Sequence, residues 1–263
     1  MNYLLGLSIM YSNNKKQKQV DAMIMAAGRG ARMRYMTNFI AKPLLKISKL
    51  SMLETNINNL YKGGIEKIII NSSYKHLTIE KGLKNIKLKK KIPETILTYE
   101  KVMLETGGGL KNAINYFNSS NVLIINGDSI LHNKDGYCPV KELRQNFNEC
   151  KMDVLLLLSK RKNVFGYYGK GDYKKINNSY TPKITSGISS LSLKYVFTGW
   201  QIINKRIIND FPEKIFSLKK VYDLAEKNGR LHGIIHQGNF LHIGDLKSYF
   251  LVDKFLKTRK ISL

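Results

Sequence analysis

Residues 23–33 read MIMAAGRGARM, an apolar run that breaks into a loop with two glycines and two arginines. The apolar residues from Val20 onward predict a buried strand. Without Cβ atoms, Gly28 and Gly30 allow a tight turn that points backbone N–H groups at a phosphate. Arg32 can add directed hydrogen bonds to phosphate oxygens. Because open α/β sheets bind ligands at the carboxyl ends of their strands, this segment indicates a phosphate-binding loop.

A structural turn or the start of a dinucleotide-binding Rossmann unit is the alternative interpretation of this loop. The third glycine of the dinucleotide pattern would fall at Met33, and the loop carries cations where such sites rely mainly on backbone amides. Soon afterwards, Lys42-Pro43-Leu44-Leu45 places a further cation just before a second apolar run. These features favour nucleotide phosphates as the ligand.

Composition limits the partners. The 263 residues include 44 Lys and Arg against 19 Asp and Glu, which gives a formal net charge of +25. Such a charge suggests nucleic acid or an anionic membrane. However, only eight of the basic residues are arginine, the side chain that most often recognises phosphates and base edges. We therefore expect no nucleic-acid partner and a general positive field that attracts phosphorylated substrates.

The termini and cysteines indicate a cytoplasmic protein. No apolar run reaches the ~20 residues of a membrane span, and residues 1–19 lack the basic start and cleavage site of a signal peptide. We interpret residues 1–19 as an N-terminal extension. Cys138 and Cys150 are the only cysteines, and their spacing matches no disulfide framework or metal motif. We expect a reduced protein without membrane insertion.

Strands and helices alternate along the first half, which predicts a three-layer α/β sheet. A capping box at Ser51 begins one helix, and Gly63-Gly64 ends it. The Lys84–Lys91 run is interpreted as one solvated face of a strand or helix, and residues 160–192 as hairpins or loops. Further strands are expected at 65–71, 96–99, 122–125, 152–158, 195–203 and 231–236, and helices at 77–83, 110–117, 217–228 and 246–257.

Two later segments carry further chemistry. Asn126-Gly127-Asp128 follows the strand 122–125 directly, so its carboxylate faces the same crevice as the glycine loop. A carboxylate opposite a cation-rich loop suits a magnesium–nucleotide complex, although Asp is also a common turn residue. Residues 104–110, LETGGGL, place three glycines at the start of a helix, where a flat group can lie against bare backbone.

In this order, these motifs resemble those of the sugar-1-phosphate nucleotidyltransferase family, and the similarity runs from about residue 20 to 257. The resemblance is greatest to short bacterial uridylyl- and guanylyltransferases. It implies a Rossmann-like fold with a mixed, mostly parallel sheet in a single domain over 20–263. The nucleotide-binding half would span about 20–150 and the sugar-phosphate-binding half about 151–263. It also implies the reaction NTP + sugar 1-phosphate → NDP-sugar + pyrophosphate, with UTP and N-acetylmuramate 1-phosphate as the expected substrates and Mg²⁺ as cofactor.

The resemblance assigns roles by position. At the nucleotide, Ala27 and Gly28 would contact the nucleoside and Gly30 the phosphates. Arg32 would stabilise the leaving pyrophosphate, and Lys42 the α-phosphate or the sugar phosphate. The remaining expected site residues are Thr106, Gly107 and Gly108 for the nucleotide, Glu105, Asn126, Thr198 and Gly199 for the sugar, and Asp128 for the metal.

The sequence departs from the family pattern at one position that matters chemically. The family commonly carries a second metal-binding Asp near its end, whereas this chain reads Phe240-Leu241-His242-Ile243-Gly244-Asp245. His242 therefore takes the place of the carboxylate. Imidazole suits Mn²⁺ better than Mg²⁺, so we expect His242 as a second metal ligand, with Mn²⁺ as an alternative ion. A structural histidine is the other interpretation.

The attacking oxygen is a phosphate oxygen that is already largely ionised near neutral pH, so the mechanism needs no general base. Three other functions stay open from the sequence. They are guanylyl transfer to mannose 1-phosphate, a glycosyltransferase, for which Asp128-Ser129-Ile130 lacks the usual second Asp, and a nucleotide-binding regulator without turnover. The sequence leaves base, sugar and oligomeric state undetermined, with a monomer or small homo-oligomer expected.

Overall fold

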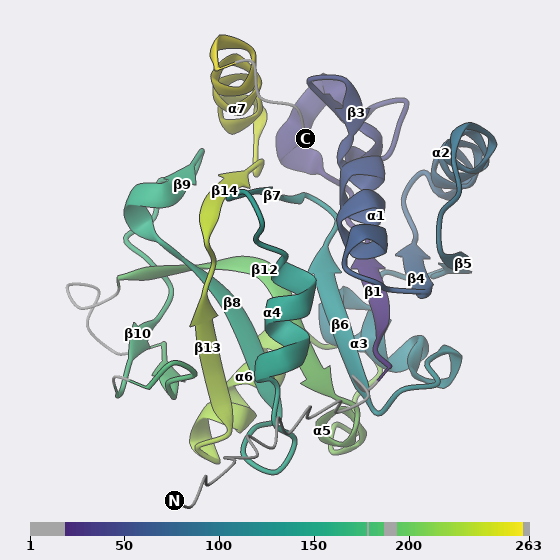
Figure 1. Ribbon diagram of the computed structural model, residues 1–263. Coiled ribbons are helices and arrows are strands. Elements are labelled where there is room, and N and C mark those ends of the chain that lie inside the picture. The colour runs from purple at the N-terminus through teal and green to yellow at the C-terminus, as the bar shows by residue number, and fades with distance from the viewer. Residues whose placement is uncertain (1–18, 178, 187–193, 260–263) are drawn as a thin grey trace, which may run out of the picture.

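The computed structural model describes residues 19–177, 179–186 and 194–259. Apart from Gln19, the expected N-terminal extension lies outside the described residues, as do residues 178 and 187–192 of the expected loop region. A seven-stranded sheet forms the centre (Figure 1). Its strands, in spatial order, are β13 (Leu231–Ile235), β8 (Val154–Lys160), β12 (Tyr195–Asn204), β6 (Asn121–Asn126), β1 (Asp21–Met25), β4 (Lys67–Ser72) and β5 (Glu94–Tyr99).

The sheet is mixed and mostly parallel, as the sequence predicted. Only β12 runs against its neighbours β6 and β8, while the other neighbouring pairs are parallel. β1, which leads into the glycine loop, lies between β6 and β4. The carboxyl ends of β1, β4, β5 and β6 therefore meet at one edge of the sheet, where ligands of such folds bind.

Alternating side chains of the strands fill two separate cores. Ala22 and Ile24 of β1 pack toward α1 (Met52–Lys62), α2 (His76–Lys89) and α4 (Pro139–Asn146). Met23 packs toward α3 (Glu105–Asn112), α5 (Arg206–Asn209) and α6 (Leu218–Lys227) on the other face. This period of two is that of a strand buried on both faces, and it confirms the three layers.

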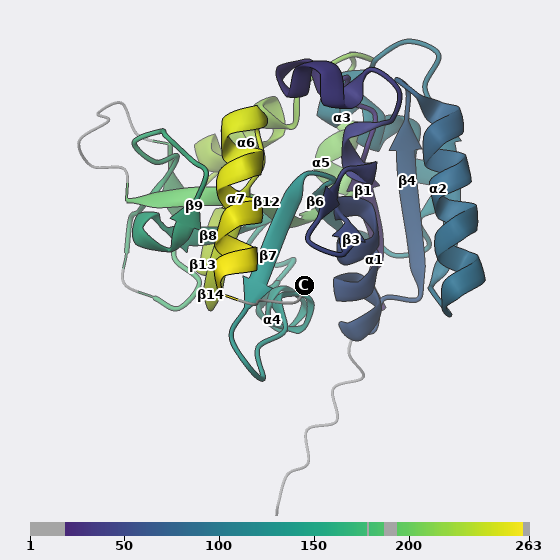
Figure 2. The ribbon, with the colours of Figure 1, turned by 90° about the horizontal axis from the view of Figure 1, so that it is seen from above.

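A smaller ribbon stands beside the main sheet. It contains β7 (Ser129–Asn133), β14 (Gly238–His242) and β9 (Val164–Phe165), with β14 in the middle. The last helix, α7 (Leu246–Thr258), packs on this ribbon through Val252 and Leu256 (Figure 2). The remaining short elements are β2 (Lys46–Ile47), β3 (Leu50–Ser51), β10 (Lys174–Lys175), β11 (Ile184–Thr185) and the 3₁₀ turns at 31–37, 42–44, 114–116 and 161–163.

Helix starts and ends follow their capping residues. The Ser51 side chain accepts a hydrogen bond from the Glu54 amide and begins α1, which ends at the expected Gly63. The Glu54 carboxylate, however, pairs with Lys90 instead of closing the expected box. Asp245 and Ser248 form a reciprocal capping box at the start of α7, which was not predicted.

Two helices differ from the sequence expectation. α2 continues to Lys89 rather than stopping at Leu83, because Ile86 adds a further buried residue on the same face. The lysine run therefore belongs mostly to this helix. α3 begins at Glu105, so the three glycines lie inside the helix and not before it. Among the described residues, none of the helices has the length and apolar character needed to cross a membrane.

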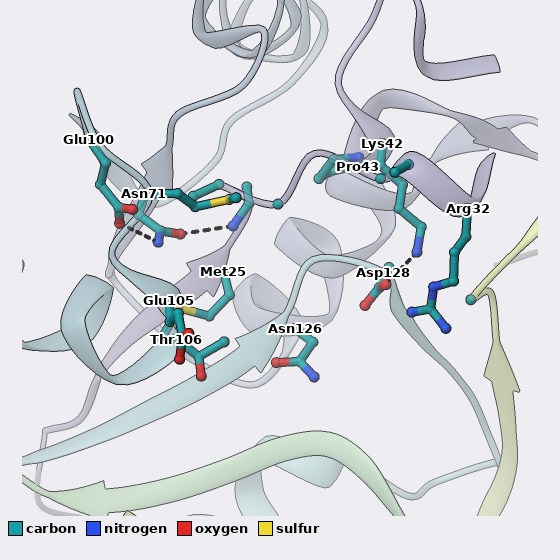
Figure 3. Close-up of a pocket in the computed structure, with 17 residues that line it drawn as sticks. Met25, Arg32, Lys42, Pro43, Asn71, Glu100, Glu105, Thr106, Asn126 and Asp128 are labelled. Atoms are coloured by element: carbon teal, nitrogen blue, oxygen red, sulfur yellow. Dashed lines mark hydrogen bonds and ion pairs between the residues drawn. The ribbon is translucent and has the colours of Figure 1, made fainter. Parts of the chain in front are cut away.

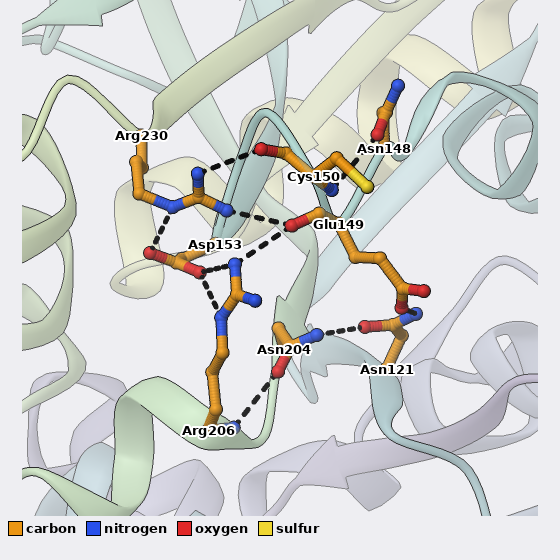
Figure 4. A network of polar contacts seen from close by, with 8 residues as sticks. All are labelled: Asn121, Asn148, Glu149, Cys150, Asp153, Asn204, Arg206 and Arg230. Atoms are coloured by element: carbon orange, nitrogen blue, oxygen red, sulfur yellow. Dashed lines mark hydrogen bonds and ion pairs between the residues drawn. The ribbon is translucent and has the colours of Figure 1, made fainter.

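An ion-pair network ties together the edge of the sheet opposite the carboxyl ends (Figure 4). Asp153, only 6 % exposed, accepts hydrogen bonds from Arg206 Nε at 2.8 Å and Arg230 Nε at 2.7 Å. Both guanidinium groups also donate to the backbone oxygen of Glu149. These residues flank β8, β12 and β13, so the network fixes the three strands to one another where they carry no site residue.

Candidate active site

The glycine loop is fixed at both of its ends. The Ala26 amide donates to Asn71 Oδ1 at 2.8 Å, and the Gly30 oxygen accepts from the Met33 amide at 2.8 Å and from Thr37 Oγ1 at 3.2 Å. Gly30 has φ 64°, a conformation that favours glycine, whereas a Cβ on Gly28 would meet nothing within 4 Å. The backbone and the nearby Lys42 side chain therefore favour glycine at Gly30, while Gly28 leaves open space beside the cavity.

The cation and the carboxylate expected from the sequence face each other (Figure 3). Nζ of Lys42 lies 2.5 Å from Oδ2 of Asp128, with side chains that are 9 % and 36 % exposed. Lys42 stands in a 3₁₀ turn stiffened by Pro43, and Asp128 follows β6. Between them, Gly127 donates its amide to the Met25 oxygen of β1, which joins the carboxyl ends of the two strands. The Arg32 side chain, exposed at the start of the 3₁₀ turn after the loop, points into the same end of the crevice.

These side chains line one cavity of about 390 Å³ at the carboxyl edge of the sheet. Arg32, Lys42 and Asp128 form its charged end, and Asn126 lies on its floor. The other lining residues are Met25, Ala26, Ala27, Gly28, Gly30, Ala31, Pro43, Asn71, Glu100, Met103, Glu105, Thr106 and Gly244. Of the fourteen site residues expected from the sequence, nine line this cavity, and the five that do not are Gly107, Gly108, Thr198, Gly199 and His242.

A buried pair that was not predicted forms the opposite end of the cavity. Asn71 Nδ2 donates to Glu100 Oε1 at 2.7 Å, and the other carboxylate oxygen accepts from the Leu104 amide. Burial raises the pKa of Glu100, and the Asn71 and Leu104 hydrogen bonds oppose this. Both residues end parallel strands, β4 and β5, so the strand-end rule that singled out Asp128 could also have found them.

Gly107 and Gly108 lie inside α3 and do not line the cavity, so their contact with the nucleotide stays a prediction. Their amides both donate to the Phe216 oxygen. A Cβ on Gly107 would collide with the Phe216 ring, and one on Gly108 with the Lys214 oxygen. These glycines therefore let α3 pack closely on the 214–216 segment, and only their neighbours Glu105 and Thr106 reach the cavity.

Two expected sugar contacts also take other positions. Thr198 is fully buried, and its hydroxyl donates to the Leu157 oxygen at 2.8 Å. It lies where the pairing of β12 with β8 shifts register, between Phe197 and Gln201. Gly199 has φ 80°, and a Cβ there would collide with Ser129 and press on Asn126. The absence of a side chain at Gly199 therefore leaves room for the Asn126 side chain, which lines the crevice.

His242 ends β14 directly opposite Ser129, the residue after Asp128. Its ring makes edge contacts with Tyr167 and Phe240, and it forms no hydrogen bond within the described part of the chain. Burial lowers the pKa of His242, and the charge of Asp128 opposes this. No group of three or more acidic, His or Cys side chains that could hold a metal occurs among the described residues. Within the described part of the chain, a metal ion at Asp128 would therefore need further ligands from phosphates and water.

A cation-lined loop after one parallel strand and a carboxylate after the next are features of enzymes that act on nucleotide phosphates. The model of the Nucleotidyl transferase family matches residues 21–258, and the chain belongs to this family. Its relatives include sugar-1-phosphate nucleotidyltransferases.

N-acetylmuramate alpha-1-phosphate uridylyltransferase of Caulobacter vibrioides is 29 % identical over 85 % of this chain and 91 % of its own. D-glycero-alpha-D-manno-heptose 1-phosphate guanylyltransferase of Campylobacter jejuni is 26 % identical over 88 % and 97 %. Among solved structures, HddC from Yersinia pseudotuberculosis complexed with GMP-PN matches with a TM-score of 0.69 and 26 % identity, over 90 % of this chain and 100 % of that one.

Proposed function

We propose that this enzyme transfers a uridylyl group from UTP to N-acetylmuramate 1-phosphate. The observation that carries the proposal is the similarity, over 85 % of this chain, to the Caulobacter vibrioides enzyme named for that reaction. Guanylyl transfer to a heptose or mannose 1-phosphate is the second candidate, because the Campylobacter jejuni relative is similar over a comparable length.

The crevice supplies what in-line transfer between phosphates needs. The nucleoside would lie at the end formed by Asn71, Glu100 and Thr106, and the triphosphate would extend toward Arg32 and Lys42. A sugar phosphate oxygen then attacks the α-phosphorus, the bond to the β-phosphate breaks, and pyrophosphate leaves with the displaced electron pair. Positioning and charge neutralisation account for catalysis of this kind, without a protein base.

We further propose that Asp128 holds Mg²⁺, with His242 as the second protein ligand. The fit is chemical: Asp128 is the one carboxylate at the charged end of the described cavity, and its only ion-pair partner there is Lys42. When bound, the ion would neutralise charge on the phosphate oxygens. Lys42 and Arg32 would add fixed positive charge to the same phosphates.

A matrix of four nucleoside triphosphates against N-acetylmuramate, heptose, mannose and glucose 1-phosphates, with pyrophosphate release as the readout, tests the proposal. We expect the highest kcat/KM for UTP with N-acetylmuramate 1-phosphate. An Asp128→Ala variant with an unchanged melting temperature is the inactive control. A preference for GTP with a heptose or mannose phosphate would overturn the uridylyl assignment and support the second candidate.

A further inference from the structure

A second cavity of about 630 Å³ lies away from the crevice. It stands where the far end of the β7–β14 ribbon approaches the ends of β8 and β13 and the start of β12. Its described lining shares no residue with the crevice. The nucleotidyl transfer derived above gives this cavity no role.

The lining is cationic and rich in hydrogen-bonding groups. Lys134, Lys160 and Lys175 contribute three ammonium groups, and none of them has an ion-pair partner among the described residues. No described lining residue is Asp or Glu. Lys175 lies over the ring of Tyr195, with Nζ 5.7 Å from its centroid. The side-chain amides come from Asn133, Asn163, Gln237 and Asn239.

A buried histidine at this cavity gives an independent indication of a ligand. His236 is 2 % exposed and lines the cavity, yet neither of its ring nitrogens has a hydrogen-bond partner of good geometry. The carbonyl groups of His132 and Asn239 stand beside the ring, but burial dominates and lowers the pKa of His236 to about 4. The ring is therefore neutral near pH 7 and carries one donor and one acceptor. Buried polar atoms without partners are rare in native proteins.

We propose that this cavity is a second binding site, for a small phosphorylated and hydroxyl-rich ligand. The ammonium groups provide charge-assisted hydrogen bonds to phosphate oxygens. The amides and the neutral His236 ring, which can both donate and accept, match hydroxyl groups. The described lining contains no carboxylate that would repel the phosphate.

The position of the site connects it to the crevice. His132 pairs with Asn239 at the cavity end of the ribbon, and Ser129 pairs with His242 at the crevice end. A ligand that bridges β7 and β14 at the cavity end of the ribbon can therefore shift the opposite ends of the same two strands. β7 begins there next to Asp128, and β14 ends there at His242. We therefore assign to this site a small phosphorylated molecule that regulates nucleotidyl transfer without being a substrate.

Lysine acetylation followed by mass spectrometry tests binding directly. The probes are inorganic phosphate, glucose 6-phosphate and AMP, which distinguish a bare phosphate, a sugar phosphate and a nucleotide. We expect glucose 6-phosphate or AMP to slow acetylation of Lys160 and Lys175 and to leave Lys87 and Lys91 unchanged. The latter two are exposed lysines outside the cavity and serve as internal controls. Equal protection of all four lysines, or protection by inorganic phosphate alone, overturns the proposal.

A charge-removing variant provides the second test. In isothermal titration with the protecting probe, K160Q/K175Q should bind about tenfold more weakly, as loss of two charge-assisted contacts predicts. The control K87Q/K91Q should bind like the wild type. The probe should also change the rate of pyrophosphate release in the wild type and not in K160Q/K175Q. An unchanged wild-type rate overturns the effector role, and equal binding by both variants overturns the site.

Discussion

The ammonium group of Lys42 lies 2.5 Å from the carboxylate of Asp128, at the point where the proposed metal would bind. This contact therefore joins the proposed metal ligand, Asp128, to a cation proposed to bind phosphate, Lys42. While Lys42 holds Asp128, the carboxylate is already neutralised, so a divalent ion must displace the ammonium group. The displaced Lys42 then becomes available for a phosphate. Metal binding and the positioning of Lys42 are linked through this pair.

Removal of the ammonium group should therefore strengthen metal binding and weaken catalysis. In Lys42→Met without nucleotide, we expect Mn²⁺ affinity, measured by electron paramagnetic resonance of the free ion, to rise about tenfold. Turnover should fall by a factor of about 10²–10³, as for the loss of a preorganised charge. Lys49→Met, at an exposed lysine outside the crevice, is the matched control. Unchanged Mn²⁺ affinity would show that Asp128 and the metal do not meet.

The two loop glycines should respond differently to the same substitution. Gly30→Ala places a Cβ in a left-handed backbone, within 3.0 Å of the Lys42 Cβ, and should destabilise the protein by about 1–2 kcal/mol. Gly28→Ala meets no atom and should keep the wild-type stability, while KM for the nucleotide rises because the methyl group occupies ligand space. Urea denaturation and steady-state kinetics provide the comparison. Equal stability of the two variants would contradict the assignment.

His242→Asp separates a metal ligand from a structural histidine. If His242 holds the ion, the carboxylate should shift the preference from Mn²⁺ toward Mg²⁺, because oxygen suits the harder ion. We expect this shift in the ratio of kcat/KM values in the two metals, with a modest change in melting temperature. An unchanged ratio together with a much lower melting temperature would make His242 a packing residue beside Tyr167 and Phe240.

The Asp153 network should contribute stability without affecting catalysis. Asp153→Asn leaves two guanidinium groups without their carboxylate, and we expect a loss of about 2–3 kcal/mol in the free energy of unfolding, since both arginines keep some solvent access. Asp223→Asn removes the partner of Lys219 in an exposed pair and should change stability by less than about 1 kcal/mol. Because the network lies at the opposite edge of the sheet, kcat should stay unchanged. A fall in kcat without a loss of stability would refute this assignment.

Stability should fall in mild acid, and His236 should account for part of the loss. Its pKa is lowered from 6.5 to about 4 in the folded state by burial, so the unfolded chain binds more protons between these values. The contribution of His236 is therefore complete above pH 6.5 and is lost as the pH falls toward 4, to a total of about 3 kcal/mol. His236→Phe should flatten the dependence of unfolding free energy on pH over this window. An unaltered slope would exclude His236 as its source.

The sequence predicted most of the sheet because the buried strands are continuous apolar runs, and local patterns suffice for these. It placed Ala27, Lys42 and Asp128 in one crevice because residues that follow parallel strands converge at one edge. It did not predict the surroundings of Gly107, Gly108 and Thr198, because these depend on partners far along the chain. Phe216 covers the glycines, and the threonine is buried where β12 shifts register against β8. Neither contact can be predicted from the residues that neighbour these positions in the sequence.

The ribbon of β7, β14 and β9 affects the order in which the proposed site is assembled during synthesis. β7 and β14, the strands beside Asp128 and at His242, pair although nearly half of the chain separates them. A growing polypeptide contains the glycine loop, Lys42 and Asp128 well before His242 has been added. His242 joins them only after β14 has been synthesised and α7 covers the ribbon. The metal site that we propose for Asp128 and His242 is therefore complete only after the last strand and the last helix have been synthesised and packed.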